Sequence, residues 1–156
     1  MKDKTYASHS PVAYQFRIPE QELDSILNRV EHFPWHEMPE DGGWNYGANL
    51  DYMKELCDYW VNKFDWRAQE ARINSFNNFK LNISGVDMHY IIEEGSGPNP
   101  KPLMISHGWP GSVLEFFDLI EPLAHPEKFG GHVEDAFTVV APSLPGFGFS
   151  GPPTRP

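Results

Sequence analysis

The feature that most constrains the fold of this chain is a strand–helix–strand pattern in its second half. A short apolar run, Leu103-Met104-Ile105, is typical of a strand that is covered on both faces. It is followed by a Ser112-x-x-Glu115 capping box, by apolar residues at helical spacing, and by a second apolar run over 137–141. Two such strands joined by a helix require a right-handed crossover and a mostly parallel sheet. The pattern predicts an α/β protein.

A β-hairpin is predicted directly before this unit. Apolar and polar residues alternate over 79–83 and again over 86–92, and the two runs meet at Ser84-Gly85. Alternation with a period of two is typical of strands, and a short Gly-containing connection is typical of a tight turn. We therefore expect two antiparallel strands ahead of the strand–helix–strand unit.

Three helices are predicted before the hairpin. One begins at Pro19 and ends before Pro34, because proline suits a first turn but not a helix interior. After a loop rich in Trp, Pro and Gly, Asn49 is a good N-cap for a second helix and Asp65 for a short third one. Residues 1–18 show no clear period, and we expect a tail. The second helix is expected to carry its apolar residues on one side: Met53, Leu56, Cys57, Trp60, Val61 and Phe64.

The chain thus divides near residue 75 into a helical region, 1–75, and the first part of an α/β core, 76–156. Its formal net charge of −10 argues against a surface that binds DNA or RNA phosphates. No apolar run approaches the roughly 20 residues of a membrane helix, and no signal peptide is visible, so we expect a cytoplasmic protein. The single cysteine, Cys57, excludes an intramolecular disulfide and a cysteine-cluster metal site, and we expect no cofactor.

The turn between the first buried strand and the capped helix is the most informative segment. It is His107-Gly108-Trp109-Pro110-Gly111-Ser112. A glycine-rich turn that leaves the carboxyl end of a strand exposes backbone N–H groups, and the following helix N-terminus adds positive dipole. Such an arrangement suits an oxygen on which negative charge develops. A tight strand-to-helix turn without chemistry is the alternative interpretation.

A second glycine-rich segment follows the next strand. It is Pro145-Gly146-Phe147-Gly148-Phe149-Ser150. It lacks the third glycine and the following helix of a dinucleotide-binding fingerprint, so a nucleotide site is not predicted. Taken alone, it is a structural turn.

Together, the two segments are much more specific than either one. HGWPGS, followed about thirty residues later by PSLPGFGFS, resembles the α/β-hydrolase fold and, within it, the epoxide hydrolase family in its microsomal-type and fungal soluble branch. The segment Phe64-Asp65-Trp66-Arg67 and the hairpin around 85–90 are similar to the N-terminal region of that family. The resemblance covers roughly residues 12–153.

The resemblance implies a helical meander followed by the first half of an α/β-hydrolase sheet, incomplete and with strand order 1-2-4-3. It also implies conversion of an epoxide to a vicinal diol through an Asp-ester intermediate, with a His that activates water. In that family the backbone N–H at Trp109 is one of two oxyanion donors, and the peptide before Pro110 is cis. The substrate-binding residues implied are His107, Gly108, Trp109 and Pro110.

The sequence departs from the family because it lacks the turn that carries the nucleophile. The nucleophile belongs in a small-x-Asp-x-small turn after the second glycine-rich segment, and no such turn follows. No G-x-S-x-G is present either, so a serine esterase is not predicted. Asp87 lies in a similar-looking context, but inside the predicted hairpin, so we do not expect it to be a nucleophile.

We therefore expect the N-terminal part of an epoxide hydrolase that is inactive alone. Its expected partner is a small-molecule epoxide, once the remaining residues are supplied. A non-catalytic interaction module or truncated gene product is the alternative, and another α/β-hydrolase such as a dehalogenase is a further one. Because the strand at 103–105 would lack one neighbour, the chain alone is predicted to be marginally stable, to self-associate, or to bind a complementary chain.

Overall fold

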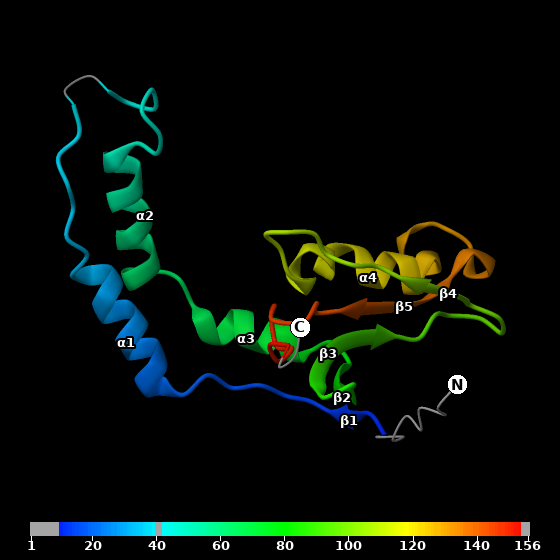
Figure 1. The fold of residues 1–156 in the computed structure, drawn as a ribbon. Helices are drawn as coiled ribbons and strands as arrows, with labels where there is room; N and C mark the ends of the chain where they lie inside the picture. Colours follow the sequence, from blue (N-terminus) through cyan, green and yellow to red (C-terminus); the bar gives the residue numbers. More distant parts are fainter. Residues whose placement is uncertain (1–9, 40–41, 154–156) are drawn as a thin grey trace, which may run out of the picture. The chain divides into compact units, whose positions relative to one another are not determined.

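The computed structural model describes residues 10–39 and 42–153, which form two compact units (Figure 1). One unit combines the segment that ends at Gln15 with the chain from Ala71 onward, and we call it the sheet unit. The other comprises Phe16–Glu70, and we call it the helical unit. Across the described residues, no helix has the length and apolarity needed to cross a membrane.

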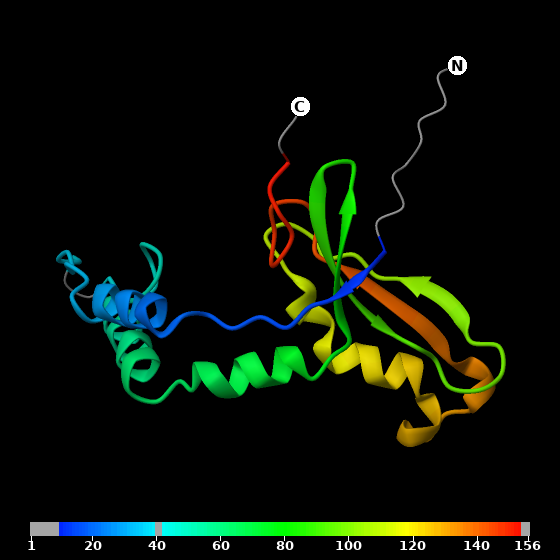
Figure 2. The same cartoon turned by 90° about the horizontal axis from the view of Figure 1, so that it is seen from below.

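The sheet unit contains one sheet of five strands in the order β1-β2-β3-β5-β4 (Figure 2). The predicted order 1-2-4-3 corresponds to β2-β3-β5-β4 and is found. The additional strand comes from the segment predicted as a tail, because two of its residues pair with β2; residues 1–9 of that segment lie outside the described residues. The strands are β1 (Val12–Ala13), β2 (Asn78–Ile83), β3 (Val86–Glu93), β4 (Lys101–Met104) and β5 (Phe137–Pro142).

The sheet is mixed, not mostly parallel as predicted. Among the described strands only β4 and β5 pair in parallel, and the β1–β2, β2–β3 and β3–β5 pairs are antiparallel. The physical reason is that only the strand–helix–strand unit forces a parallel pair, whereas a hairpin can join its strands only in antiparallel fashion. The predicted hairpin turn is confirmed: Ser84 and Gly85 have φ values of 54° and 90°, as a type I′ turn requires.

The predicted crossover helix is confirmed, although its first turn is tighter than an α-helix. A 3₁₀ turn, η1 (Val113–Phe116), leads into α4 (Phe117–Ala124), which packs against β5 and β3 (Figure 1). The core of the unit forms between them, where Ile91, Ile120 and Val139 are at most 1% exposed. Two further 3₁₀ turns, η2 (Pro126–Phe129) and η3 (Val133–Asp135), lead to β5.

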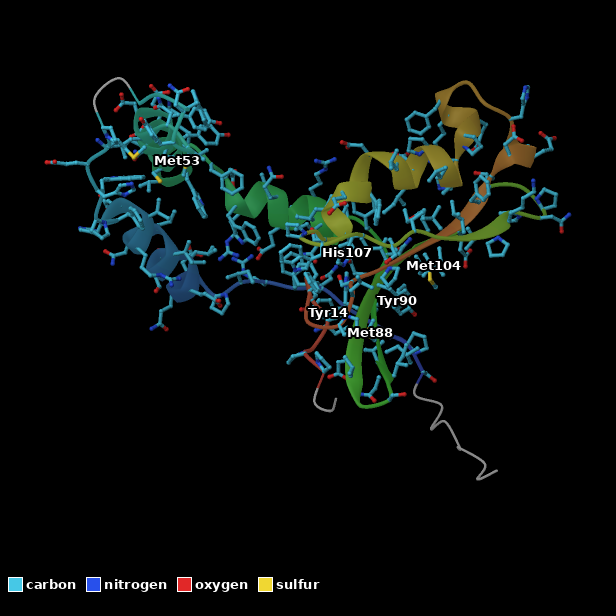
Figure 3. All side chains as sticks on the ribbon, turned by 45° about the horizontal axis from the view of Figure 1, so that its top comes forward. Tyr14, Met53, Met88, Tyr90, Met104 and His107 are labelled. Carbon is cyan, nitrogen blue, oxygen red and sulfur yellow. The ribbon has the colours of Figure 1, made fainter. Side chains whose placement is uncertain are left out.

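The strand β4 lies at the edge of the sheet, with β5 as its strand neighbour. The prediction that this strand is covered on both faces is wrong for the described residues, because Met104 is 70% exposed (Figure 3). An edge strand with one covered face leaves every second side chain in solvent. The expectation of a single strand neighbour is met within the part of the chain that the structure describes.

The helical unit contains α1 (Glu20–Glu31), α2 (Leu50–Asn62) and the start of α3 (Trp66–Asn74), which continues into the sheet unit. The predicted caps are present: Asn49 Oδ1 accepts from Tyr52 N–H at 3.0 Å, and Asp65 Oδ1 accepts from Ala68 N–H at 2.9 Å. Helices α1 and α2 contact each other, yet neither contains a buried residue.

The apolar side predicted for α2 therefore splits into two lines. Residues spaced four apart, Met53, Cys57 and Val61, are partly covered. The adjacent line of Leu56, Trp60 and Phe64 is exposed, at 42%, 42% and 37%, and Phe64 lies just beyond the end of α2. One neighbouring helix covers only a narrow stripe of a helix surface, so a stripe this wide stays half uncovered.

An ion-pair cluster ties the start of α1 to α3 in the helical unit. Arg67 donates to both carboxylate oxygens of Glu70, at 2.8 and 3.0 Å, and also to Glu20. Glu70 Oε1 accepts a further hydrogen bond of 2.7 Å from Ile18 N–H. Burial opposes ionisation of Glu70, but the hydrogen bond from Ile18 and the pairing with Arg67 outweigh it and lower the pKa of the carboxyl.

Candidate active site

The four predicted site residues lie together in one turn at the carboxyl end of β4. We call residues 107–112 the HGWP turn. The peptide between Trp109 and Pro110 is cis, as expected from the resemblance. The two ring side chains at the start of the turn differ in exposure: His107 is 3% exposed and Trp109 is 84% exposed. The turn is thus anchored by one residue and open to solvent at another.

The anchor connects the HGWP turn with the second glycine-rich segment. We call residues 143–151 the GFGF loop. Leu144 N–H donates to His107 Nε2 at 3.0 Å, and the Phe147 ring lies edge-on to the imidazole at 5.5 Å. A backbone N–H can only donate, so Nε2 is unprotonated and the proton is on Nδ1, which donates to Gly108 O at 3.0 Å. Both ring nitrogens of His107 are therefore used in a neutral ring.

The backbone N–H of Trp109 is available to a ligand. Within residues 10–39 and 42–153 it has no hydrogen-bond acceptor. The neighbouring donors are used: Ser112 N–H donates to Glu115 Oε1 at 3.1 Å, and Leu114 N–H to Ser112 Oγ at 3.3 Å, which confirms the predicted capping box. An N–H without an acceptor, next to such a fixed structure, is a suitable donor to an anionic oxygen.

Glycine is required at position 111 by close packing. A Cβ there would lie 2.0 Å from Glu115 Oε1 and 2.8 Å from Gly108 O. Glu115 cannot move away without losing its bond to Ser112 N–H. A side chain at Gly111 would therefore break the cap and shift the HGWP turn.

The GFGF loop folds back on itself and onto the hairpin. Phe147 N–H donates to Leu144 O at 2.9 Å, and Gly151 N–H donates to Asp87 O at 2.9 Å. Gly148 has a φ of 52°, and a Cβ at this position would lie 2.7 Å from Ser143 Oγ. The GFGF loop, which taken alone was predicted to be a structural turn, is thus a packed element that contacts both the HGWP turn and β3.

Asp87 has the structural role expected of it. It lies in β3, where Asn82 Nδ2 donates to its Oδ1 at 2.7 Å. A nucleophile elbow needs a sharp strand-to-helix turn, and this residue is inside a regular hairpin strand.

His89 is the residue of this region that sequence reasoning missed. The predicted alternation over 86–92 places His89 at a polar position, yet it is fully buried, as is Ile91 two residues later. Burial, together with the charge of Lys80, lowers the pKa of His89 to about 4. The sequence contains a signal for this burial. His89 and Ile91 are two residues apart, so they lie on the same face of the strand, and the apolar Ile91 indicates that this face is covered.

Comparison with protein families identifies most of the chain. The family model described as "Epoxide hydrolase N terminus" matches residues 11–116, and the one described as "alpha/beta hydrolase fold" matches residues 101–156. The two matches overlap over the HGWP turn.

Curated relatives agree with this match. The chain is 38% identical over 141 residues to epoxide hydrolase 1 of Sus scrofa, covering 88% of this chain and 31% of that protein. It is 38% identical over 140 residues to juvenile hormone epoxide hydrolase 1 of Ctenocephalides felis, covering 87% and 29%. The chain therefore spans about a third of the length of the curated relatives it matches.

A solved structure supports the fold. The Aspergillus niger epoxide hydrolase superposes with a TM-score of 0.80 at 30% identity, over 96% of this chain and 39% of that one. With the family model matching 11–116, the strand–helix–strand unit and the two connected loops, the chain belongs to the epoxide hydrolase family, whose N-terminal region it represents.

Proposed function

We propose that this chain supplies the oxyanion turn of an epoxide hydrolase that converts an epoxide to a vicinal diol. The observation that supports the proposal is the Trp109 N–H, which has no acceptor among the described residues, in an exposed residue of a turn that His107 anchors. In this proposal His107, Gly108, Trp109 and Pro110 form the wall against which the substrate lies. In this proposal the region 76–156, which carries this wall, is the first part of the α/β core, and the region 1–75 is the N-terminal helical region of the family, from which Val12–Ala13 pairs into the sheet.

The proposed reaction has two steps. An aspartate carboxylate attacks an epoxide carbon, the carbon–oxygen bond breaks, and the freed oxygen takes a proton from an acid. Water, deprotonated by a histidine, then adds to the ester carbonyl, and a tetrahedral oxyanion forms before the diol leaves. Trp109 N–H donates to this oxyanion, which lowers the barrier of the second step.

The other reacting groups are assigned to the part of the relatives' length that this chain does not span. Asp87 is held in the hairpin, and no G-x-S-x-G occurs in the sequence. We therefore expect these 156 residues alone to form no diol. The proposal is tested in the protein expressed from the complete coding region that contains this chain.

The experiment removes the Trp109 N–H. It also makes Gly108 C=O an ester carbonyl, which still accepts from His107 Nδ1 but is a weaker acceptor. Replacing Trp109 by its α-hydroxy acid analogue converts the peptide N–H into an ester oxygen. We expect kcat for an aryl epoxide to fall about 10²–10³-fold, the range found when one oxyanion donor is removed. Trp109→Phe is the matched control, because it keeps the N–H while changing the ring, and it should retain most of kcat.

Two outcomes contradict the proposal. If kcat is equal in the ester variant and the wild type, the Trp109 N–H does not contribute to catalysis. If the protein from the complete coding region forms no diol, it does not have the proposed epoxide hydrolase activity. Release of halide from a haloalkane by the same protein would instead favour a dehalogenase.

A non-catalytic interaction role is the second candidate, and the edge of β4 favours it. Met104 of β4 is 70% exposed, and Leu114 of η1 and Leu119 of α4 are 50% and 51% exposed. An edge strand with apolar neighbours is suited to pairing with another segment or a second copy. In this alternative the protein from the complete coding region forms no diol, and the HGWP turn is a structural turn.

A further inference from the structure

A buried hydrogen-bond network surrounds His89, about which neither the family match nor the proposed reaction says anything. Its side chain has no exposed surface, and both ring nitrogens have partners. Nε2 lies 2.9 Å from Asn78 Oδ1, and Nδ1 lies 2.9 Å from Ser143 Oγ. The ring therefore connects the start of β2 with the start of the GFGF loop.

The direction of each hydrogen bond in this network follows from its donors. Asn78 Nδ2 donates to Ile73 O and to Phe76 O, both at 2.8 Å, so both of its amide protons are used. Its Oδ1 must then face His89, and Nε2 of the ring must be the donor. In a neutral ring Nδ1 accepts, so the Ser143 hydroxyl donates to it. His89 and His107 are thus held in opposite tautomers.

The backbone of His89 fixes the other end of the GFGF loop. His89 N–H donates to Ser150 Oγ at 2.8 Å, and the Ser150 hydroxyl donates to Ser143 O at 2.7 Å. Ser143 N–H in turn donates to His89 O at 2.9 Å. One residue of β3 therefore holds both Ser143 and Ser150, although these are seven residues apart.

Two aromatic rings pack against the imidazole from either end of the unit. Phe149 of the GFGF loop is edge-on to His89 with ring centres 5.1 Å apart, and Tyr14, which follows β1, is edge-on with ring centres 5.9 Å apart. Lys80, opposite His89 in the β2–β3 register, places its ammonium 4.0 Å from the Tyr14 ring centre. The apolar cover and the nearby positive charge both favour the neutral ring.

The network continues directly into the candidate site. Ser143 is followed by Leu144, whose N–H donates to His107 Nε2 at 3.0 Å, and His107 Nδ1 donates to Gly108 O. We propose that His89 is a positioning residue for the HGWP turn: by fixing Ser143 it fixes Leu144 N–H, and through it the ring that anchors Trp109. This inference rests on the proposed function, since the turn positioned is the one that donates to the oxyanion.

The first test measures the two tautomers directly. In the protein from the complete coding region, labelled with ¹⁵N-histidine, we expect His89 to be protonated at Nε2 and His107 at Nδ1. The resonances are assigned by their loss in His89→Gln and His107→Gln. A His89 ring protonated at Nδ1, or a charged ring at neutral pH, would overturn the network, and both tautomers are measured in the wild type.

The second test removes one hydrogen bond at a time. Ser143→Ala deletes the hydroxyl that donates to His89 and leaves the backbone of the loop intact. Ser75→Ala is the matched control, because it also deletes one hydroxyl donor, to Arg72 O at 2.7 Å, outside the network. We expect hydrogen exchange in the segment that contains Leu144 to be about tenfold faster in Ser143→Ala, and the His107 resonance to show both tautomers.

The comparison separates positioning from general destabilisation. If Ser143→Ala accelerates exchange in β5 by the same factor as at Leu144, its effect is global and the proposal fails. If exchange at Leu144 is unchanged, the proposal fails as well. In Ser75→Ala we expect the exchange at Leu144 and the His107 tautomer to match the wild type.

Kinetics then separate this inference from the proposed function. For an epoxide substrate we expect Ser143→Ala to lower kcat about tenfold with KM changed less than twofold, because a displaced donor acts on the oxyanion and not on substrate binding. A normal kcat in Ser143→Ala, alongside a large loss in the Trp109 ester variant, would overturn the positioning role only. No diol from any form, with the expected tautomers and exchange, would overturn the proposed function only.

Discussion

In the sheet unit Ile91, Ile120 and Ala141 have no exposed surface, whereas α1 and α2 of the helical unit contain no buried residue at all. The two units have similar local signals: both have capped helices, and both are rich in apolar side chains. They differ in what covers those side chains. The large exposed apolar residues of the helical unit include Phe33, Trp44, Tyr46, Tyr52, Leu56, Tyr59 and Trp60.

This difference indicates where each unit obtains its stability. The sheet unit packs a helix on a sheet and has its own core, so burial of apolar surface stabilises it. Two helices of 12 and 13 residues with a narrow contact are near the lower limit at which helices persist in water. In the helical unit, the helix caps and the Glu20–Arg67–Glu70 cluster are local interactions that stabilise the helices. The candidate site is built on the unit that has a core.

The largest expected effect compares one apolar truncation in each unit. Ile120→Ala removes a fully buried side chain of α4 and should lower the free energy of unfolding by about 2–5 kcal/mol. Leu56→Ala removes an apolar side chain of α2 that is 42% exposed, and the loss should stay within about 0.5 kcal/mol. Urea unfolding of both variants measures the two values. Equal losses of unfolding free energy in the two variants would show that Leu56 is buried in solution, and would contradict the difference in burial between the two units.

The second expected effect is a pH dependence that belongs to the sheet unit. The pKa of His89 is about 4 in the folded chain, against an ordinary value of 6.5. The unfolded chain therefore binds the proton more readily, so the stabilisation is complete above about pH 6.5 and is lost as the pH falls toward 4. A difference of this size corresponds to roughly 3 kcal/mol.

The measurement is urea unfolding at a series of pH values, with His89→Gln as the comparison. The window between about pH 6.5 and 5 isolates the histidine, because carboxyl groups with lowered pKa values, such as Glu70 and Glu127, begin to lose their contribution only at lower pH. The wild type should lose stability across this window and the variant should lose much less. Parallel curves would contradict the neutral, buried ring.

The same contrast explains which features could be predicted from the sequence. Local chemistry predicted the cap at Asn49, the capping box at Ser112 and the turn at Ser84-Gly85, because each depends on a few adjacent residues. The pattern of strand, helix and strand predicted the β4–β5 pair and hence the position of the HGWP turn. These are the features that the chain determines within a short distance.

The missed features all depend on distant neighbours. The strand β1 pairs with residues more than sixty positions away, and a two-residue strand leaves no period to detect. His89 can lie on the covered face of β3 because Asn78 of β2 and Ser143 of the GFGF loop satisfy its ring. The exposed line on α2 has the composition of a covered one, and only its surroundings decide whether it is covered.

The smallest expected effect compares the two helix caps. Asn49→Ala removes the acceptor for Tyr52 N–H at the start of α2, and Ser112→Ala removes the acceptor for Leu114 N–H at the start of η1. Each cap is worth about 1 kcal/mol in a helix that unfolds with its domain. In the sheet unit we expect that full value as a loss of global stability, because η1 and α4 unfold together with the core.

In the helical unit the same loss should appear locally. If α2 opens independently of the sheet, Asn49→Ala raises hydrogen exchange over Leu50–Asn62 about fivefold while the urea midpoint of the sheet unit stays unchanged. Hydrogen exchange resolved by segment measures both quantities in one sample, and Asn49→Asp, which keeps a capping oxygen, is the control that should restore slow exchange. A shift of the global midpoint by Asn49→Ala equal to that of Ser112→Ala would mean that the two units unfold as one, so that the apolar line on α2 is covered when the protein is folded in solution.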